Sequence, residues 1–277
     1  MATETIGLIA GNGSFPVLFA RAARERGFRV AAVAHRGETV ASIDGEVDSC
    51  VWVRVGQLGR AIRALRSAGV RRAVMAGGID KKRSLIHVRP DWRGLRALRA
   101  SRARGDDAIL RTVAGEFERD GIEIVSSTLF LDHIVAAAGR IAGPAPTAAA
   151  LADVRLGCRV LQALGPLDVG QGVVVEGGMV LAIEAVEGTD AAVRRGGAIG
   201  RGQAVVVKLA KRGQDLRFDV PAVGPATIET MAAAGARTLA VEAGRAIVLE
   251  GDRVSRLAEN SGISVLGCTA DGEVAGG

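Results

Sequence analysis

The chain has 277 residues, of which 48% are hydrophobic and 24% charged, a balance typical of a folded protein rather than a disordered one. Its three cysteines lie far apart, which indicates neither a disulfide framework nor a zinc site and favours the reducing cytoplasm. No segment approaches the ~20 uninterrupted apolar residues of a membrane-spanning helix, and the first apolar run, Ile6 to Ala10, is too short for a signal peptide. The net charge of +6 is local, because residues 81–104 contain nine Lys or Arg and a single acid.

Strands and helices alternate through the first half of the sequence. Continuous apolar runs predict strands, and apolar residues at helical spacing predict helices that end at glycines. The predicted strands are 6–11, 28–35, 47–55, 71–78 and 122–127, and the predicted helices are 16–26, 58–69 and 106–121. This order is typical of a parallel sheet with covering helices, so residues 1–143 are expected to form a Rossmann-like α/β domain.

The segment "GPAP", Gly143 to Pro146, interrupts every pattern and marks the expected domain junction. Beyond it the sequence predicts a helix over 147–165, a hairpin over 170–188 that turns at Gly177 and Gly178, and a mixture of shorter strands with a helix over 225–236. A distinct α+β domain is therefore expected over residues 147–267. Residues 268–277 lack apolar periodicity and are expected to be a disordered tail.

The first strand ends in a glycine loop, "IGLIAGNGSFP". Gly11, Asn12 and Gly13 precede Pro16, which suits the first turn of a helix, so the loop can present backbone N–H groups to a phosphate. The second strand ends at His35 and Arg36, where an NAD site needs an acidic residue; Arg36 could instead meet the 2′-phosphate of NADP. A tight turn that binds no ligand remains the alternative.

The second half holds the densest polar chemistry. "EAVEGTD" contains Glu187, Thr189 and Asp190, and "KLAKRGQDLRFD" contains Lys208, Lys211, Gln214, Asp215, Arg217 and Asp219. Carboxylates beside lysines are typical of metal-assisted phosphate chemistry, in which acids hold Mg²⁺ or orient water and cations neutralise phosphate oxygens. A solvated hairpin with ion pairs is the other interpretation. Read as a strand, residues 215, 217 and 219 would share one face.

The basic segment 81–104 predicts a helix that starts near Pro90. Its apolar side chains fall on one side and its arginines on an adjoining stripe: Trp92, Leu95 and Leu98, and Arg93, Arg96, Arg99 and Arg102. Such a helix fits the surface of anionic lipid, a phosphate backbone, or solvent with one edge packed on the sheet. Only 3% of residues are aromatic and none is tyrosine, so no platform for stacking bases exists and no nucleic-acid partner is expected.

Five motifs in this order resemble the bacterial UDP-2,3-diacylglucosamine pyrophosphatase (LpxI) family: "IGLIAGNGSFP", "MAGGIDKK", "SSTLFLDH", "EAVEGTD" and "KLAKRGQDLRFDVPAVGPATI". The resemblance covers essentially the whole chain to Leu266. It implies Mg²⁺-dependent hydrolysis of UDP-2,3-diacylglucosamine to lipid X (2,3-diacylglucosamine 1-phosphate) and UMP, a step of lipid A synthesis. It also implies a homodimer in the cytoplasm, peripheral to the inner membrane.

The resemblance further implies roles for individual residues. Asp215 is carried over as the essential catalytic acid, with Asp219 as the alternative position, and Asp190 and Glu187 join Asp215 as metal ligands. The expected substrate-binding residues are Gly11, Asn12, Gly13, Gly77, Gly78, Thr189, Lys208, Lys211 and Gln214. Two other functions are kept open: a non-catalytic module that binds a nucleotide sugar or lipid, and an NADP-dependent reductase.

Overall fold

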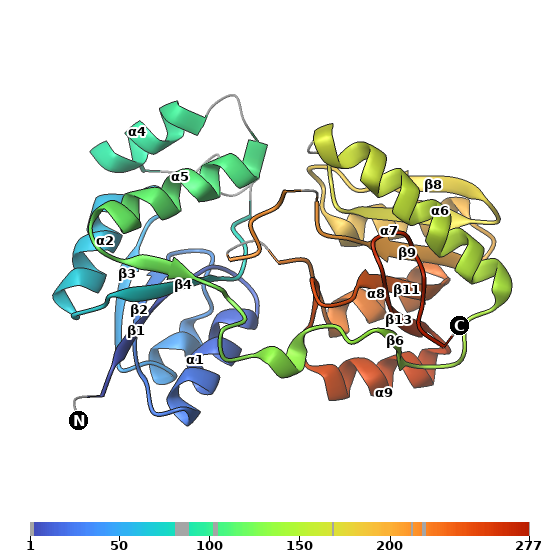
Figure 1. Ribbon diagram of the computed structural model, residues 1–277, viewed down its shortest axis with the longest axis horizontal. Coiled ribbons are helices and arrows are strands. Elements are labelled where there is room, and N and C mark those ends of the chain that lie inside the picture. The colour runs from blue at the N-terminus through green and yellow to red at the C-terminus, as the bar shows by residue number, and fades with distance from the viewer. Residues whose placement is uncertain are drawn as a thin grey trace. The chain divides into compact units, whose positions relative to one another are not determined.

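The computed structural model describes residues 3–80, 89–101, 105–167, 169–211, 213–217 and 220–276. The chain forms two compact units, each with its own sheet (Figure 1). The first contains the residues up to Asp132 and a short segment around Asp215 and Arg217; the second contains the residues from His133 to Gln214 and those from Val220 onward. Within the described ranges no helix has both the length and the apolarity to cross a membrane.

The first unit is built on a five-stranded parallel sheet in the order β3-β2-β1-β4-β5. Its strands are β1 (Thr5–Ala10), β2 (Arg29–His35), β3 (Ser49–Val53), β4 (Arg72–Ala76) and β5 (Glu123–Val125). The result confirms the Rossmann-like class predicted from the strand-helix alternation. The strand order reverses between β1 and β4, and in such sheets ligands bind beyond the carboxyl ends of the strands at this reversal.

Helices cover both faces of the first sheet (Figure 1). Helix α1 (Phe15–Glu25) packs on one face, α2 (Leu58–Ser67) and α5 (Gly105–Arg119) pack on the other, and α4 (Trp92–Ser101) lies against α2 and α5. Pro16 occupies the first turn of α1, where its missing N–H costs no helical hydrogen bond. The two short 3₁₀ helices in this part of the chain are η1 (Ala41–Gly45) and η2 (Asp132–Ile134).

The second unit is built on a mixed six-stranded sheet in the order β6-β13-β11-β9-β7-β8. Strands β9, β11 and β13 run parallel, whereas β6, β7 and β8 each pair antiparallel with a neighbour. Their bounds are β6 (Gly139–Ala142), β7 (Gly172–Glu176), β8 (Met179–Ile183), β9 (Ala204–Lys208), β11 (Ala236–Glu242) and β13 (Ser264–Cys268). A separate small sheet pairs β10 (Ala222–Val223) with β12 (Ile247–Val248).

Helix α6 (Ala148–Leu164) covers one face of this sheet, and the other face is covered by α7 (Thr189–Ile199), α8 (Pro225–Ala234) and α9 (Gly251–Ser261). A 3₁₀ helix, η3 (Gly165–Leu167), follows α6. The predicted β7–β8 hairpin is present, and Asp153 of α6 fixes its turn by accepting the N–H groups of Gly177 and Gly178 at 2.8 and 2.7 Å. Helices α7 and α9 are findings of the structure, because the sequence pattern predicts neither.

The unit boundaries differ from those expected at Gly143 to Pro146. Strand β6 precedes that segment yet pairs with β13, so it belongs to the second unit. The end of the chain also differs from a disordered tail: Cys268 closes β13, Val274 bridges to it, and the N–H of Thr269 donates to the carbonyl of Glu273 at 2.9 Å. The segment is therefore ordered by backbone hydrogen bonds, which the lack of apolar periodicity in its sequence could not reveal.

Candidate active site

Two glycine loops meet at the strand reversal of the first sheet. The N–H of Gly11 donates to the carbonyl of Ala76 at 2.8 Å, and the N–H of Asn12 donates to the carbonyl of Gly78 at 2.7 Å. A Cβ on Gly11 would lie 2.3 Å from that same Gly78 oxygen, so only glycine allows the approach. The structure therefore brings together the predicted residues Gly11, Asn12, Gly77 and Gly78.

These contacts decide which backbone groups of the loops can face a ligand. The N–H groups of Gly11 and Asn12 are used inside the loops, and the N–H of Gly78 donates to Oδ1 of Asn12 at 3.2 Å. Across the described ranges, no such internal bond forms at the N–H of Gly13 or Gly77. Gly13 also precedes the N-terminus of α1, where the helix dipole attracts anions.

An acidic side chain that was not among the predicted site residues, Glu38, stands beside this loop. Oε2 of Glu38 accepts hydrogen bonds from Nδ2 of Asn12 at 3.3 Å and from the N–H of Asp80 at 2.9 Å. Among described residues Oε1 of Glu38 has no partner. A carboxylate just beyond the second strand is the group that reads ribose hydroxyls in such folds. Glu38 could have been predicted from its position, because it lies three residues after the predicted end of the second strand.

His35 is half-buried beside the loop and has a structural role. Its Nδ1 lies 2.8 Å from the carbonyl oxygen of Ala10, and the hydroxyl of Thr39 donates to that same oxygen at 2.7 Å. Burial lowers the pKa of His35, so the ring is neutral at physiological pH. The residue holds the ends of β1 and β2 together rather than offering a charge to a ligand.

Asp215 belongs to the first unit although it follows most of the second in sequence. The carbonyl of Arg217 accepts the N–H of Ser127 at 3.0 Å, just beyond the carboxyl end of β5. The guanidinium of Arg217 also donates to Glu118 of α5 at 3.0 Å and to the carbonyl of Ile124 at 3.3 Å. Since all strands of the sheet are parallel, this backbone contact lies at the edge that carries the glycine loops.

The carboxylate of Asp215 forms a two-pronged ion pair with Arg217. Its Oδ1 accepts the Nε–H of Arg217 at 3.0 Å and its Oδ2 accepts an Nη2–H at 2.8 Å. The hydrogen bonds and charge of Arg217 lower the pKa of Asp215, so the group is ionised at neutral pH. An acid whose pKa lies below its ordinary value is a poor general base and is better suited to orienting water or holding a cation.

The local conformation of this segment differs from the predicted strand. Leu216 and Arg217 lie in a turn, and the backbone N–H of Arg217 also donates to Oδ1 of Asp215 at 3.1 Å. The shared face expected from strand parity is therefore wrong for these two residues; the turn brings them together. Asp219 and Arg212 lie outside the described residues.

The acids of "EAVEGTD" belong to the second unit. Glu187 forms an ion pair with Arg195 at 2.6 Å. Asp190 lies in the first turn of α7, where a negative charge interacts favourably with the helix dipole. Thr189 donates its hydroxyl to Oε1 of Glu184 at 3.0 Å. Glu184 is the buried acid of this motif and was not among the predicted site residues. It lies two positions after the buried Ala182 of β8, so in an extended chain both side chains face the same side of the sheet, and this alternation could have indicated its burial.

The predicted cationic and amide residues follow β9 in the second unit. Lys208 is buried, and its Nζ donates to the carbonyl of Ala222 at 2.9 Å. The N–H of Lys211 donates to Oε1 of Gln214 at 2.7 Å, and the N–H of Gln214 returns a bond to the carbonyl of Lys211 at 3.1 Å. Gln214 thereby shapes the turn that leads to Asp215.

The predicted Mg²⁺ ligands divide between the units: Asp215 in the first, Glu187 and Asp190 in the second. The described residues contain no group of three His, Cys, Asp or Glu side chains that could hold a metal ion. Mg²⁺ is commonly held by one or two carboxylates together with substrate phosphates and water. The ionised carboxylate of Asp215 fits that mode of binding, whereas a site made only of protein ligands does not fit the described side chains.

Helix α4 carries the basic segment that the sequence singled out. Trp92 is 76% exposed and Arg99 is exposed, whereas Arg93 pairs with Asp120, so the predicted arginine stripe is partly neutralised. Residues 81–88 and 102–104, with five of the cations, lie outside the described residues.

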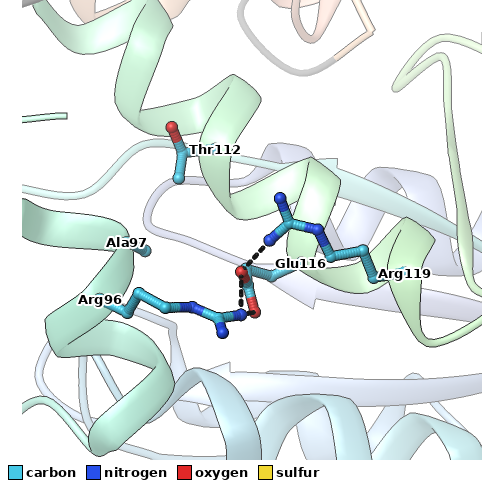
Figure 2. A pocket seen from close by; sticks show the side chains of 5 residues that line it. All are labelled: Arg96, Ala97, Thr112, Glu116 and Arg119. Atoms are coloured by element: carbon cyan, nitrogen blue, oxygen red, sulfur yellow. Dashed lines mark hydrogen bonds and ion pairs between the residues drawn. The ribbon is translucent and has the colours of Figure 1, made fainter. Parts of the chain in front are cut away.

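A pocket opens between α4 and α5 (Figure 2). Its floor is Glu116, whose side chain is 2% exposed and accepts Arg96 at 2.6 and 2.8 Å and also Arg119. Ala97 and Thr112 complete the lining, and none of the predicted site residues is among them. Because the two guanidinium groups already serve one buried carboxylate, the pocket is best explained as part of the α4–α5 packing.

Comparisons with known proteins agree with the geometry. The LpxI N-terminal domain model matches residues 5–134 and the LpxI C-terminal domain model matches residues 137–266. The UDP-2,3-diacylglucosamine pyrophosphatase LpxI of Caulobacter vibrioides is 35% identical over 273 residues, covering 95% of this chain and 96% of that protein.

Solved structures are similar only at a low level. A biotin carboxylase domain of a thermophilic 2-oxoglutarate carboxylase is 12% identical with a TM-score of 0.27, covering 61% of this chain and 34% of that chain. The biotin carboxylase subunit of a pyruvate carboxylase is 15% identical with a TM-score of 0.26, covering 66% and 38%. The two domain models and the curated relative span nearly the whole sequence, and the chain therefore belongs to the LpxI family.

Proposed function

We propose that the protein hydrolyses the diphosphate of UDP-2,3-diacylglucosamine to lipid X and UMP. The observation that carries the proposal is 35% identity to a pyrophosphatase of that name over 95% of the chain. The chemistry of the described residues is consistent with it. Glycine loops with backbone N–H groups at a helix N-terminus suit a phosphate, and an ionised aspartate lies on the same sheet edge.

Asp215 acts as an ionised carboxylate in this proposal. Arg217 holds it in one orientation through two parallel hydrogen bonds. Its low pKa keeps the charge present across the physiological range. The carboxylate therefore positions the attacking water, while proton removal is left to bulk solvent or to the phosphate itself.

The backbone and the cations bind the substrate phosphates. The N–H groups of Gly13 and Gly77 in the first unit donate to phosphate oxygens. Lys208 and Lys211 of the second unit are proposed as further substrate-binding residues. Asp215 is the carboxylate of the first unit that would hold Mg²⁺, together with substrate phosphates and water. When bound, the ion would neutralise charge that develops on the diphosphate oxygens.

The lipid substrate also places the protein at a membrane in this proposal. We propose a peripheral, cytoplasmic-side association with the inner membrane, supported by the exposed Trp92 and Arg99 of α4. We also propose a homodimer. The homodimer is supported by β8, which is an edge strand with exposed Met179 and Val180. Sedimentation velocity of the purified protein should give twice the monomer mass.

The function is tested by release of UMP from UDP-2,3-diacylglucosamine in detergent micelles. Asp215→Asn should lower turnover about 10²–10³-fold while substrate binding persists, and the exposed Asp132→Asn control should match the wild type. EDTA should abolish UMP release and Mg²⁺ should restore it. Near-normal turnover by Asp215→Asn would overturn the role of Asp215. A wild-type protein that binds the substrate but releases no UMP would instead support the non-catalytic binding module.

A further inference from the structure

Asn12 joins the loops that follow β1, β2 and β4 at the strand reversal of the first sheet. Its Oδ1 accepts the N–H of Gly78 at 3.2 Å, and its Nδ2 donates to Oε2 of Glu38 at 3.3 Å. Its backbone N–H donates to the carbonyl of Gly78 at 2.7 Å. Both polar atoms of the Asn12 side chain therefore bond within the protein.

The glycines beside Asn12 allow the loops to close on it. A Cβ on Gly77 would lie 2.3 Å from the backbone carbonyl oxygen of Asn12, and a Cβ on Gly78 would lie 3.2 Å from Oδ1 of Asn12. Gly77 also has a φ of 83°, in the left-handed region that favours glycine. Asn12 is half-buried as a result, and its amide is held between the two loops.

The carboxylate of Glu38 is held through one of its two oxygens. Oε2 accepts the Nδ2–H of Asn12 and, at 2.9 Å, the N–H of Asp80. Two donors on one oxygen restrict the rotation of the carboxylate and so fix the direction of the other oxygen. Among the described residues no donor reaches that other oxygen, Oε1. Asn12 thus helps to orient an acceptor that a ligand can use.

The loops around Glu38 are open to solvent. Gly13, Gly77 and Gly78 are exposed, and a Cβ on Gly13 would meet no atom within 4 Å. A nucleotide phosphate at the N–H groups of Gly13 and Gly77 brings its ribose toward the loop after the second strand in folds of this class. All these residues belong to the first unit, so this part of the site needs no group from the second.

We propose that Asn12 is a positioning residue, which orients Glu38 so that Oε1 of Glu38 accepts a ribose hydroxyl of the uridine nucleotide. The inference rests on the proposed function and deepens it, because it names what selects a ribonucleotide. A direct contact between Asn12 and a substrate phosphate suits the geometry less well. The only donor of the Asn12 side chain, Nδ2, lies 3.3 Å from the Glu38 carboxylate, whose charge repels a phosphate oxygen.

The test measures the dissociation constants of 2′-deoxy-UMP and UMP by calorimetry and takes their ratio, because a change at the phosphate affects both nucleotides alike. The wild-type ratio should be about 10, as expected for one hydrogen bond to a charged acceptor. Asn12→Ala should bring the ratio to about 1. Asn12→Asp keeps the acceptor for Gly78 but faces Glu38 with a second carboxylate, so it should do the same. Asn260→Asp, an exposed change on α9, is the control and should keep the wild-type ratio.

A double variant separates positioning from direct contact. If Asn12 acts through Glu38, adding Asn12→Ala to Glu38→Ala should leave the ratio unchanged. In UMP release from UDP-2,3-diacylglucosamine, Asn12→Ala should raise KM about 10-fold and change kcat less, because the ribose hydroxyl takes no part in the reaction of the diphosphate. Circular dichroism should show that each variant is folded.

Three results would overturn the inference. A wild-type ratio in Asn12→Ala, with both nucleotides bound more weakly, would make Asn12 a direct phosphate contact. A preference for UMP that survives in Glu38→Ala and disappears only in the double variant would mean that Asn12 itself binds the hydroxyl. A wild-type protein that releases UMP from the substrate but binds both nucleotides equally would remove the ribose site and leave the proposed function standing. Conversely, a wild-type protein that prefers UMP but releases none from the substrate would support the nucleotide site and refute the proposed function.

Discussion

Arg217, two positions after Asp215, fixes the orientation of the Asp215 carboxylate and keeps it ionised. The turn brings the guanidinium back onto the carboxylate, and the other donors of Arg217 reach Glu118 and the carbonyl of Ile124. The acid is therefore attached to α5 and β5 through its own ion-pair partner. The sequence pattern predicted Asp215 by resemblance, but it could not predict this attachment, because alternation of residues 215, 217 and 219 looks the same in a strand and in this turn.

Replacing Arg217 with Ala should move the pH dependence of the enzyme. Arg217 lowers the pKa of Asp215, so its removal returns that pKa toward the ordinary value. If the ionised carboxylate is required, the acidic limb of the kcat/KM profile should shift to higher pH, while activity well above that limb falls less. Arg253→Ala, which removes exposed surface pairs, should leave the limb in place. An unshifted limb in Arg217→Ala would contradict the proposed control of Asp215.

The same pair gives a stability prediction with a definite sign. A carboxyl with a lowered folded-state pKa stabilises the protein above its unfolded pKa, and the contribution is lost as pH falls through the folded pKa. The difference in Tm between the wild type and Arg217→Ala should therefore be largest at neutral pH and should shrink in acid. Differential scanning calorimetry at several pH values measures it; a difference that grows toward low pH would refute the assignment.

Glu38 is expected to read the ribose of the nucleotide. Its Oε2 is held by Asn12 and the N–H of Asp80, which leaves Oε1 to accept a ribose hydroxyl. Glu38→Ala should weaken UMP binding about 10-fold and abolish the preference for UMP over 2′-deoxy-UMP, as measured by calorimetry. Glu25→Ala, an exposed change at the end of α1, is the matched control. Equal preference for UMP in wild type and variant would contradict this role.

At the scale of elements, helix α7, which the sequence pattern did not predict, depends on glycine packing. Helix α7 contains Gly196 and Gly197, which usually weaken a helix. A Cβ on Gly196 would lie 2.6 Å from Val174, and one on Gly197 would lie 2.2 Å from the carbonyl of Ala234. Their function is close approach to β7 and α8. Local propensity cannot reveal this, because the stabilising contacts come from residues distant in sequence.

Helix α4 shows the same device and gives a matched pair of variants. A Cβ on Gly94 would lie 2.0 Å from the carbonyl oxygen of Gly56, so Gly94→Ala must displace the helix and should cost about 1–3 kcal/mol. Gly115→Ala on α5 meets nothing within 4 Å and should stabilise by about 0.5–1 kcal/mol. Urea unfolding of both variants tests the pair. Equal effects would show that close packing at Gly56 does not hold α4.

For the whole molecule, the parts of the fold that depend on local pattern were predictable, and those that depend on pairing across the chain were not. Continuous apolar strands followed by helices predicted the parallel sheet of the first unit. The pairing of β6 with β13, the ordered residues after Leu266 and the transfer of Asp215 to the first unit all join segments distant in sequence. Among the candidate site residues, the glycine loops could be predicted by motif, whereas the position of Glu38 beside them depends on contacts between segments distant in sequence.

The association with a membrane is a prediction about the whole protein. The sequence places eight net positive charges in residues 81–104, and α4 exposes Trp92 and Arg99 from that segment. In flotation with vesicles of phosphatidylglycerol and phosphatidylcholine, Arg99→Ala should lower the partition coefficient about 5-fold. Trp92→Ala should lower it for neutral and anionic vesicles alike, because the indole inserts at the interface. Leu167→Ala, at a similarly exposed apolar residue of the second unit, should have no effect. If the partition coefficient of the wild type changes neither with anionic lipid nor with salt concentration, α4 is a solvated helix and not a membrane-binding one.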